Sequence, residues 1–431
     1  MCYSTDVANT LTPETEVPVT AEEIPQPRAW RVAFRSLRHR DFRYFWIGLI
    51  VSVTGTWMQM AAQQWLVYDL TGSSLYLGIV GACGALPMLL FTLPAGVIAD
   101  RLPKRNVVMV TQSVAMLQAL TMAALIYTGV IQVWHVIVLA VVLGTVNSVD
   151  MPTRQAMVLE LVERDDALNA VALNSSAFNL GRIIGPAISG FLIAATGVGG
   201  CFLANGLSFL AILAALAFIP PRPAGAKLSG SMTDHIADGV KWVRANPVAL
   251  ALLMLTAVSG IFAMPYTTLM PVYARVALKA SSTAYGFLFS AAGLGALTSA
   301  SLLTWFGHRW RMGRLVALGS LFFPFALMAA AAAPKYGAAV ISLYLLGVGL
   351  MLFNAVSNTM LQTMPPNSLR GRVMSLRAFV FAGMTPLGNL QIGAVAQSFG
   401  PRAALTVGGV VCLLTALVVA WRVPALRRAE E

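Results

Sequence analysis

The chain alternates long apolar stretches with short polar ones, and this alternation predicts the elements of the fold. A helix needs about 20 mostly apolar residues to cross the roughly 30 Å hydrocarbon core of a bilayer, whereas an isolated strand leaves its backbone groups unpaired in lipid. Twelve stretches reach this length, at 43–68, 74–99, 106–129, 131–151, 169–196, 200–220, 248–273, 283–306, 314–333, 337–362, 372–397 and 403–422. The pattern therefore predicts an all-α membrane protein with twelve transmembrane helices.

The two halves of the chain repeat each other in register, which predicts two pseudo-symmetric six-helix bundles. Like residues recur about 200 positions apart: Ser73, Ser74, Gly78 and Arg101 as Ser281, Ser282, Gly286 and Arg309, and Ser175 and Pro186 as Ser375 and Pro386. We divide the chain into a disordered cytoplasmic tail (1–27), an amphipathic interfacial segment (28–42), an N-terminal bundle (43–220), a cytoplasmic linker (221–247), a C-terminal bundle (248–422) and a cytoplasmic tail (423–431). Repeated halves are how many transporters place a binding site at their junction.

Composition excludes a soluble enzyme. Hydrophobic residues make up 58% of the chain and charged residues only 11%, with a mean hydropathy of +0.74, whereas soluble domains are about 25% charged. On a soluble chain, the net charge of +12 would suggest a nucleic-acid partner. In a membrane protein, basic residues gather in the cytoplasmic loops instead, so we expect no nucleic-acid binding. The four cysteines are scattered, without metal-ligand spacing, so no metal and no cofactor is expected.

The loop charges predict the orientation in the membrane. Lysine and arginine are enriched in cytoplasmic loops. Of the 29 basic residues, 24 fall in one alternate set of loops and ends and four in the other, while Arg182 lies within a span. Both termini are therefore expected in the cytoplasm.

A basic segment follows the second span and reads Gly96-Val-Ile-Ala-Asp100-Arg101-Leu-Pro103-Lys104-Arg105. It resembles the GxxxDRxGRR loop signature of the major facilitator superfamily, with Pro103 in place of the second glycine. In that family the aspartate latches the bundles in the outward-facing state at the start of the eleventh helix, whose N-terminus carries partial positive charge. The gating latch implied by the resemblance consists of Gly96, Asp100, Arg101, Lys104, Arg105, Asp150, Arg370, Gly371 and Arg372, with Lys104 and Asp150 as a charge relay. The alternative is a solvated basic loop.

A second motif lies in the fifth span. Gly181-Arg182-Ile-Ile-Gly185-Pro186-Ala-Ile-Ser189-Gly190 resembles the antiporter motif GxxxGPxxGG of exporters in the superfamily, with Ser189 in place of one glycine. Glycines four apart let another helix approach closely, so ordinary helix packing is the alternative explanation. The motif residues Gly181, Gly185, Pro186 and Gly190 nevertheless favour export.

The widest resemblance runs from Arg35 to Trp421. Asp150-Met-Pro-Thr-Arg-Gln155, Asn169-Ala-Val-Ala-Leu-Asn174 and Leu369-Arg-Gly-Arg-Val-Met-Ser375 are similar to the superfamily branch that contains the enterobactin exporter and related secretion and macrolide-efflux proteins. The resemblance implies the major facilitator fold, a monomer in a bacterial inner membrane, and export of a small molecule by alternating access. A broad multidrug or macrolide pump is the first alternative. A membrane sensor or membrane enzyme is a distant one, since no HExxH or GxSxG motif occurs.

Polar residues inside the spans indicate the substrate cavity. An ionisable residue at mid-membrane is a functional candidate, and Arg182 is the one that the sequence places there, either as a substrate or gating contact or as a structural residue. No carboxylate is expected at mid-depth, which disfavours a cationic drug and suits a neutral or anionic substrate such as a siderophore. The predicted cavity residues are Arg182, Gln59, Gln63, Asn147, Asn179, Asn354 and Asn358; interhelical hydrogen bonding is the alternative role for the amides.

The energy source is expected to be a gradient, because the chain has no GxxxxGK[ST] loop for ATP. Proton antiport is the predicted mechanism. Asp69, Asp150 and His135 are the candidate proton carriers near the membrane edges.

Overall fold

Helices are the regular elements of residues 34–222 and 232–428, the part of the chain that the computed structural model describes; its side chains are described except at 92–101, 232–237, 308 and 427–428. No strand occurs in that part. The long helices are α2 (Arg40–Thr71), α3 (Ser74–Arg101), α4 (Lys104–Tyr127), α5 (Val133–Glu160), α6 (Ala167–Thr196), α7 (Val198–Phe218), α9 (Pro247–Phe262), α11 (Ser282–Phe306), α12 (Met312–Ala332), α13 (Tyr336–Thr363) and α14 (Asn367–Arg422). The short elements are η1 (Arg35–Arg38), η2 (Arg164–Asp166), α8 (Met232–Ala245), η3 (Met264–Leu269), α10 (Met270–Val272), η4 (Tyr273–Ala277), η5 (Gly307–Arg309) and α15 (Ala425–Arg428).

The described helices supply twelve crossings, although only eleven segments have the length and composition of a span. Helix α14 has 56 residues, about 84 Å at 1.5 Å per residue, which is far more than one crossing needs. Gly400 interrupts it with φ of +83° and ψ of 164°, a conformation that glycine adopts without strain. The chain turns there, so α14 contains the predicted eleventh and twelfth spans.

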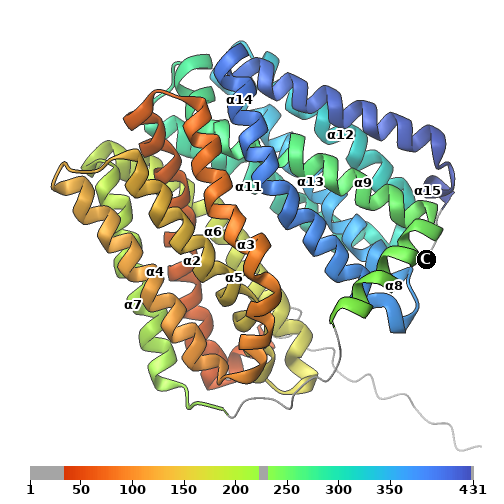
Figure 1. The fold of residues 1–431 in the computed structure, drawn as a ribbon, viewed down its shortest axis with the longest axis horizontal. Coiled ribbons are helices and arrows are strands. Elements are labelled where there is room, and N and C mark those ends of the chain that lie inside the picture. The colour runs from red at the N-terminus through yellow and green to blue at the C-terminus, as the bar shows by residue number, and fades with distance from the viewer. Residues whose placement is uncertain (1–33, 223–231, 429–431) are drawn as a thin grey trace, which may run out of the picture.

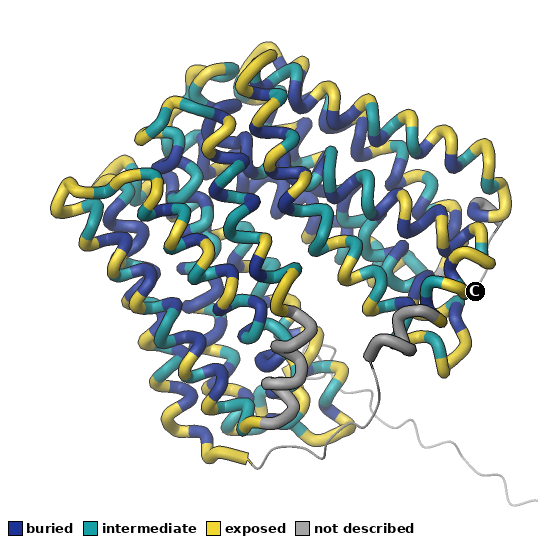
Figure 2. The backbone as a smooth tube through the Cα atoms, in the orientation of Figure 1, coloured by how far each residue is buried: buried dark blue, intermediate teal, exposed yellow. Residues whose placement is uncertain are grey.

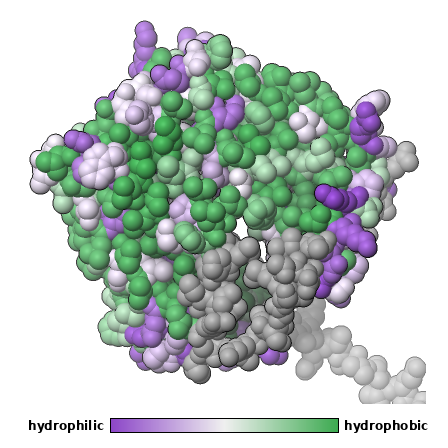
Figure 3. Space-filling view, in the orientation of Figure 1, coloured by the Kyte–Doolittle hydropathy of each residue, from purple (hydrophilic) through white to green (hydrophobic). Residues whose placement is uncertain are grey.

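The helices form two groups, α2–α7 and α9–α14, that meet at one end and diverge at the other (Figure 1). Positions where helices meet are buried, and outward-facing positions are exposed (Figure 2). The exposed positions include large apolar side chains such as Leu210, Phe325 and Leu417. Apolar residues cover most of the visible face of both groups (Figure 3). A surface of this kind requires lipid rather than water as its surroundings.

The two ends of the molecule differ in charge. The end that carries Arg40, Lys104, Arg154, Arg222 and Arg311 is called the basic end, and the other, which carries the turns at Gly72, Gly129, Gly197 and Gly400, is called the opposite end. Glycine at each of these four turns has a positive φ, which other residues rarely adopt.

The two groups are in contact at the opposite end, where α3 packs on α14 and α6 packs on α11. Glycines permit this approach. A Cβ added to Gly78 would lie 2.5 Å from the carbonyl oxygen of Asn389, and one added to Gly286 would lie 2.4 Å from the carbonyl oxygen of Pro186. The backbones therefore touch directly, as in membrane helix pairs built on small residues.

The start of the first span differs from the prediction. The sequence predicts an amphipathic interfacial segment over 28–42, but α2 already begins at Arg40, and η1 is docked on the start of α6 rather than lying apart. Ser36 donates its Oγ to the Asp166 carbonyl at 3.0 Å, and the buried Asp166 carboxylate is bound by Arg35 at 2.7 Å and Arg38 at 3.0 Å. The predicted tail at 1–27, residues 28–33 and much of the linker lie outside the described residues.

Candidate functional site

Arg182 lies on α6, on the side of the N-terminal group that faces the C-terminal group. Its neighbours Gly181 and Gly185 pack on α2, where a Cβ on Gly185 would lie 2.7 Å from the Thr54 carbonyl oxygen. The carbonyl of Ile183, one residue further, accepts a 2.6 Å hydrogen bond from Ser290 of α11. The Nε and Nη2 atoms of Arg182 are buried and have no hydrogen-bond partner. A buried, unsatisfied guanidinium is costly, so this position demands an explanation.

The helix that faces Arg182 is broken. Helix α9 ends at Phe262 and is followed by a 3₁₀ turn, one short α-turn and a π-turn, up to Ala277. Pro265 lacks an N–H, and Pro271 follows in the next turn, so neither can continue the regular ladder of hydrogen bonds. Tyr266 of this segment lies within electrostatic range of Arg182. Irregular backbone at membrane depth is tolerated where it is buried in protein or lines a cavity, and transporters place their sites at such breaks.

A cavity of about 300 Å³ lies beside the broken segment, between the two groups. Its wall comes from α2, α3, η3 and α14, and the described residues that line it include none with a charged side chain. The polar lining residues are Gln63, Gln64, Thr267, Thr268, Thr385 and Asn389. Thr268 donates to Asn389 Oδ1 at 2.8 Å, while Gln64 Oε1 is buried without a partner. The cavity offers amides and hydroxyls for an uncharged polar group.

The predicted cavity amides separate into two sets. Gln63 lines the cavity. Gln59, four residues earlier, does not: it is buried inside the N-terminal group, where it donates to Gln118 Oε1 at 2.9 Å and accepts from Asn205 Nδ2 at 2.7 Å. Its assignment to the cavity wall is corrected by this network, which is the interhelical alternative.

Replacing Gln59 by alanine is therefore expected to reduce stability rather than change substrate. The change leaves Gln118 and Asn205 with unpaired buried groups, which costs about 1–3 kcal/mol. Thermal unfolding of purified protein measures the loss, with Gln63→Ala as the matched control that should unfold near the wild-type temperature. A Gln59→Ala protein as stable as the wild type would contradict the structural role.

The four predicted asparagines lie half-buried on three helices and outside the 300 Å³ cavity. Asn179 donates to Ser175 O and Asn354 donates to Leu350 O, both at 3.0 Å within their own helices. The two other residues are Asn147 on α5 and Asn358 on α13. A role in substrate contact stays a prediction for all four.

Arg377 is one of the 24 basic residues counted with the loops and ends, although it falls inside the predicted span at 372–397; in the structure it lies within α14, ten residues after the helix start at Asn367. Its Nε is buried without a partner, and its Nη2 makes a 3.4 Å bond to the carbonyl of Asn354. By the 200-residue repeat, Arg377 lies five residues nearer the basic end than Arg182, or about 7.5 Å in depth. Among the described side chains, each bundle thus contributes one arginine with a buried nitrogen that has no hydrogen-bond partner.

The gating latch is only partly visible, because Gly96, Asp100 and Arg101 have no described side chains. Of its other members, Lys104 pairs with Glu160 and not with Asp150, so the relay between Lys104 and Asp150 is corrected. Arg105 donates to the Leu216 carbonyl at 2.7 Å. At the predicted partner helix, Arg372 pairs with Asp238 of α8, and the space around Gly371 is open. Arg370 is exposed beside it.

Asp150, which the sequence predicts near a membrane edge, is buried on α5. Thr111 and Gln112 donate to its Oδ1 at 2.7 and 2.9 Å, and Arg154 Nη2 lies 3.3 Å from its Oδ2. Arg154 in turn lies over the ring of Phe178 at 4.8 Å. These contacts stay within one bundle and compensate the carboxylate fully, as buried charges require.

The opposite end is closed by polar contacts between the bundles. Asp69 at the end of α2 pairs with Arg275 of η4, whose guanidinium also stacks on Trp65 at 3.9 Å. Gln397 of α14 accepts hydrogen bonds from the Ser73 hydroxyl and from the Ser74 N–H, each at 2.9 Å. It thereby caps the first turn of α3 from the other bundle, a contact that exists only while this end is closed.

His135, the third candidate proton carrier, has a local role. It forms a capping box with Gln132 at the start of α5 and stacks on Trp134 at 3.7 Å. These contacts account for the half-buried His135 without proton transfer.

Known proteins resemble this chain over almost its full length. A family described as a transmembrane secretion effector matches residues 31–431. The Staphyloferrin A transporter of Staphylococcus aureus is 25% identical, over 87% of this chain and 94% of its own. The Multidrug efflux pump Tap of Mycolicibacterium fortuitum is 27% identical over 87% and 94%, and the Enterobactin exporter EntS of Escherichia coli is 23% identical over 94% and 97%.

The fold recurs in solved structures. A bacterial homologue of the human lysosomal transporter Spinster, in an inward-facing and unoccupied conformation, superposes with a TM-score of 0.70 at 13% identity, covering 91% of this chain and 96% of its own. This likeness confirms the predicted fold, and the family match together with the three relatives confirms the predicted branch.

Proposed function

Because this chain belongs to the transmembrane secretion effector family of major facilitator transporters, we propose that it exports a small neutral or anionic molecule, of siderophore type, by alternating access. The family is one of membrane transporters and not of enzymes. Relatives named as a siderophore transporter and a siderophore exporter support this substrate class.

The observation that carries the proposal is Arg182. Its buried Nε and Nη2 have no hydrogen-bond partner among the described residues, and Arg182 lies outside the lining of the 300 Å³ cavity, whose described wall includes no acidic residue. A buried cation without a partner attracts an anion, because burial strengthens the interaction between opposite charges. Arg377 adds a second cation from the other bundle. A cationic drug would meet only repulsion from these two side chains.

The basic end faces the cytoplasm in this proposal, because basic loops are retained there. The contacts at the opposite end then close the outer side, and the structure is inward-facing. Export requires the reverse movement: the ion pair of Asp69 with Arg275 and the Gln397 cap break, while the basic ends of the bundles approach. We expect a monomer in a bacterial inner membrane to complete this cycle.

Proton antiport supplies the energy. One proton moving through 100 mV provides about 2.3 kcal/mol, enough for a substrate gradient above tenfold at about 1.4 kcal/mol per decade. Among Asp69, Asp150 and His135, only the Asp69 carboxylate pairs across the two bundles, with Arg275. Asp69 is therefore the carboxylate whose protonation would be coupled to opening of the outer side.

The proposal is tested by the molecules that cells secrete. Media from a deletion strain and from the strain complemented with the wild-type gene are compared by untargeted mass spectrometry, with and without iron starvation. The expected result is an anionic metabolite that is missing from the deletion medium and restored by complementation. Equal secretion by the two strains under both conditions argues against a dedicated exporter.

A multidrug pump is the second candidate, and one observation favours it. Met60 and Met264 line the 300 Å³ cavity between the two bundles, and flexible methionine side chains can pack against ligands of different shapes. The relative Tap is named as a multidrug efflux pump. Equal secretion, together with greater sensitivity of the deletion strain to several unrelated antibiotics, would favour this function.

The ion pair of Asp69 with Arg275 gives a testable coupling between the bundles. Arg275→Asp is expected to open the outer side more often, because it places two carboxylates together, and Asp69→Arg should do the same with two cations. Both side chains are about one-third exposed, so the pair contributes about 0.5–1 kcal/mol.

The matched control is the doubly exchanged protein, Asp69→Arg with Arg275→Asp, which should regain the wild-type distribution. Distances between spin labels across the opposite end measure the populations. Additive effects of the two single changes would show that the pair does not control this gate.

A further inference from the structure

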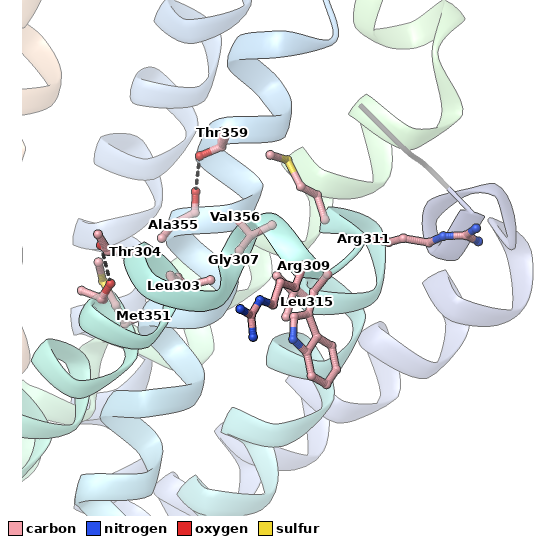
Figure 4. A pocket seen from close by; sticks show the side chains of 13 residues that line it. Leu303, Thr304, Gly307, Arg309, Arg311, Leu315, Met351, Ala355, Val356 and Thr359 are labelled. Carbon is pink, nitrogen blue, oxygen red and sulfur yellow. Dashed lines mark hydrogen bonds between the residues drawn. The ribbon is translucent and has the colours of Figure 1, made fainter. Parts of the chain in front are cut away.

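A second hollow, of about 890 Å³, lies at the basic end of the C-terminal bundle (Figure 4). It shares no lining residue with the 300 Å³ cavity between the bundles. It is bounded by the last turns of α11, by η5, by the start of α12 and by α13. Its volume falls within the roughly 300–1,000 Å³ of small-molecule sites. The wall is mainly aliphatic and includes Ala300, Leu303, Met312, Leu315, Met351 and Val356.

The rim of this hollow is basic and aromatic. Arg309 belongs to the lining, and its guanidinium lies 5.7 Å from the centre of the Phe306 ring. In Figure 4 the Arg309 side chain extends along the hollow, whereas Arg311 points away from it. Trp310, beside Arg309, is 55% exposed. No carboxylate is found among the described residues that line the hollow. Arginine and tryptophan together are typical of the membrane interface, where acyl chains meet lipid headgroups.

The hollow continues the face by which α11 packs on α6. Gly286 and Gly293 of α11 approach Pro186 and Arg182 of α6. Residues seven apart share one face of a helix, so Ala300 lies on the same face as Gly293, two turns nearer the basic end. There the bundles diverge (Figure 1). When the basic ends approach during transport, α6 moves toward the face that carries the hollow.

We propose that this hollow binds one anionic phospholipid of the cytoplasmic leaflet, with an acyl chain against the aliphatic wall and the phosphate at Arg309, and that the lipid stabilises the inward-facing state. Charge complementarity selects the anionic lipid, because the cytoplasmic leaflet is negative and each nearby arginine adds to the attraction. The position of the lipid favours the inward-facing state, because an acyl chain lying on the α6-facing side of α11 obstructs closure of the basic end. The lipid therefore keeps the two bundles apart at that end.

The experiment uses full-length protein in nanodiscs of phosphatidylcholine with a minor fraction of phosphatidylglycerol. Native mass spectrometry counts the lipids retained. Arg309→Gln is expected to weaken retention of phosphatidylglycerol about fivefold, the effect of one interfacial arginine. Ala300→Phe fills the hollow and should abolish the retained lipid, as should Ala355→Leu from the α13 side. Arg314→Gln removes a charge from the same end but outside the hollow and should leave retention unchanged.

The effect of the lipid on conformation is measured as the distance between spin labels at Leu168 of α6 and Leu318 of α12, in a protein without its native cysteines. Phosphatidylglycerol should increase the population with widely separated basic ends in the wild type and in Arg314→Gln, but not in Ala300→Phe or Ala355→Leu. Equal retention in all five proteins would overturn the lipid site. Retention of the lipid without a change in label distances would overturn its stabilisation of the inward-facing state. Neither readout uses the exported substrate, so failure here is distinct from failure of the proposed function.

Discussion

Replacing Arg182 by alanine is expected to abolish export of an anionic substrate while leaving expression and folding intact. The wild-type guanidinium is buried with two unpartnered nitrogens, so its removal deletes no hydrogen bond of those atoms. A charge-assisted hydrogen bond to substrate contributes about 1.5–3 kcal/mol, which corresponds to a roughly tenfold to hundredfold loss of affinity. Export per folded molecule, with protein quantified in the membrane, measures the effect.

Two variants sharpen this test. Arg182→Lys keeps the charge but not the planar donor geometry, and should retain part of the export. Arg402→Ala removes an arginine whose Nη2 already donates to the carbonyls of Ala277 and Ala333, and should lower stability without changing selectivity for anions. Wild-type export by a well-expressed Arg182→Ala protein would leave the residue with a structural role only.

Replacing Gly286 by leucine is expected to prevent closure of the outer side. Even a Cβ at this position would lie 2.4 Å from the Pro186 carbonyl oxygen and 3.1 Å from the Gly190 Cα. Overpacking costs about 1–3 kcal/mol. This cost applies only to the closed arrangement, so the population of the inward-facing state should fall roughly fivefold to a hundredfold. Transport should fall with it, because the cycle requires both states.

Spin-label distances across the opposite end report this shift directly. Gly337→Leu is the matched control, since a Cβ on Gly337, also at the opposite end, would meet no atom within 4 Å. That protein should keep the wild-type distribution. If Gly286→Leu were equally closed at the outer side, the contact of α6 with α11 would not limit the movement.

The twelve crossings were predictable because lipid imposes one strong requirement, a helix of sufficient apolar length. The repeat was predictable as well: Gly78 and Gly286 recur 208 residues apart, and in the structure each lies at a cross-bundle contact. At both positions glycine is required because the backbones of two helices approach closely there. The broken segment after Phe262 is signalled by Pro265 and Pro271, but its 3₁₀ and π geometry depends on packing against α14.

The side-chain partners were not predictable in the same way. Gln59 and Gln63 are one turn apart, yet Gln59 binds Gln118 and Asn205 of the same bundle and Gln63 lines the cavity, because the elements that pack on α2 change along its length. Arg377 falls inside the predicted span at 372–397, but it follows closely on Arg370 and Arg372 in the sequence, so the charge count groups it with these loop residues. The pairing of Asp69 with Arg275 joins residues about 200 positions apart, and no local pattern indicates it.

Everted inner-membrane vesicles test the central claim most directly. The anionic metabolite identified by the secretion comparison is supplied outside vesicles that contain the wild-type protein, Arg182→Ala or no transporter, with and without a proton ionophore. The account predicts accumulation in wild-type vesicles that requires the proton gradient and is lost with Arg182→Ala. Accumulation that is equal in wild-type and Arg182→Ala vesicles, or that is found only in right-side-out vesicles, would contradict export through a site formed by Arg182.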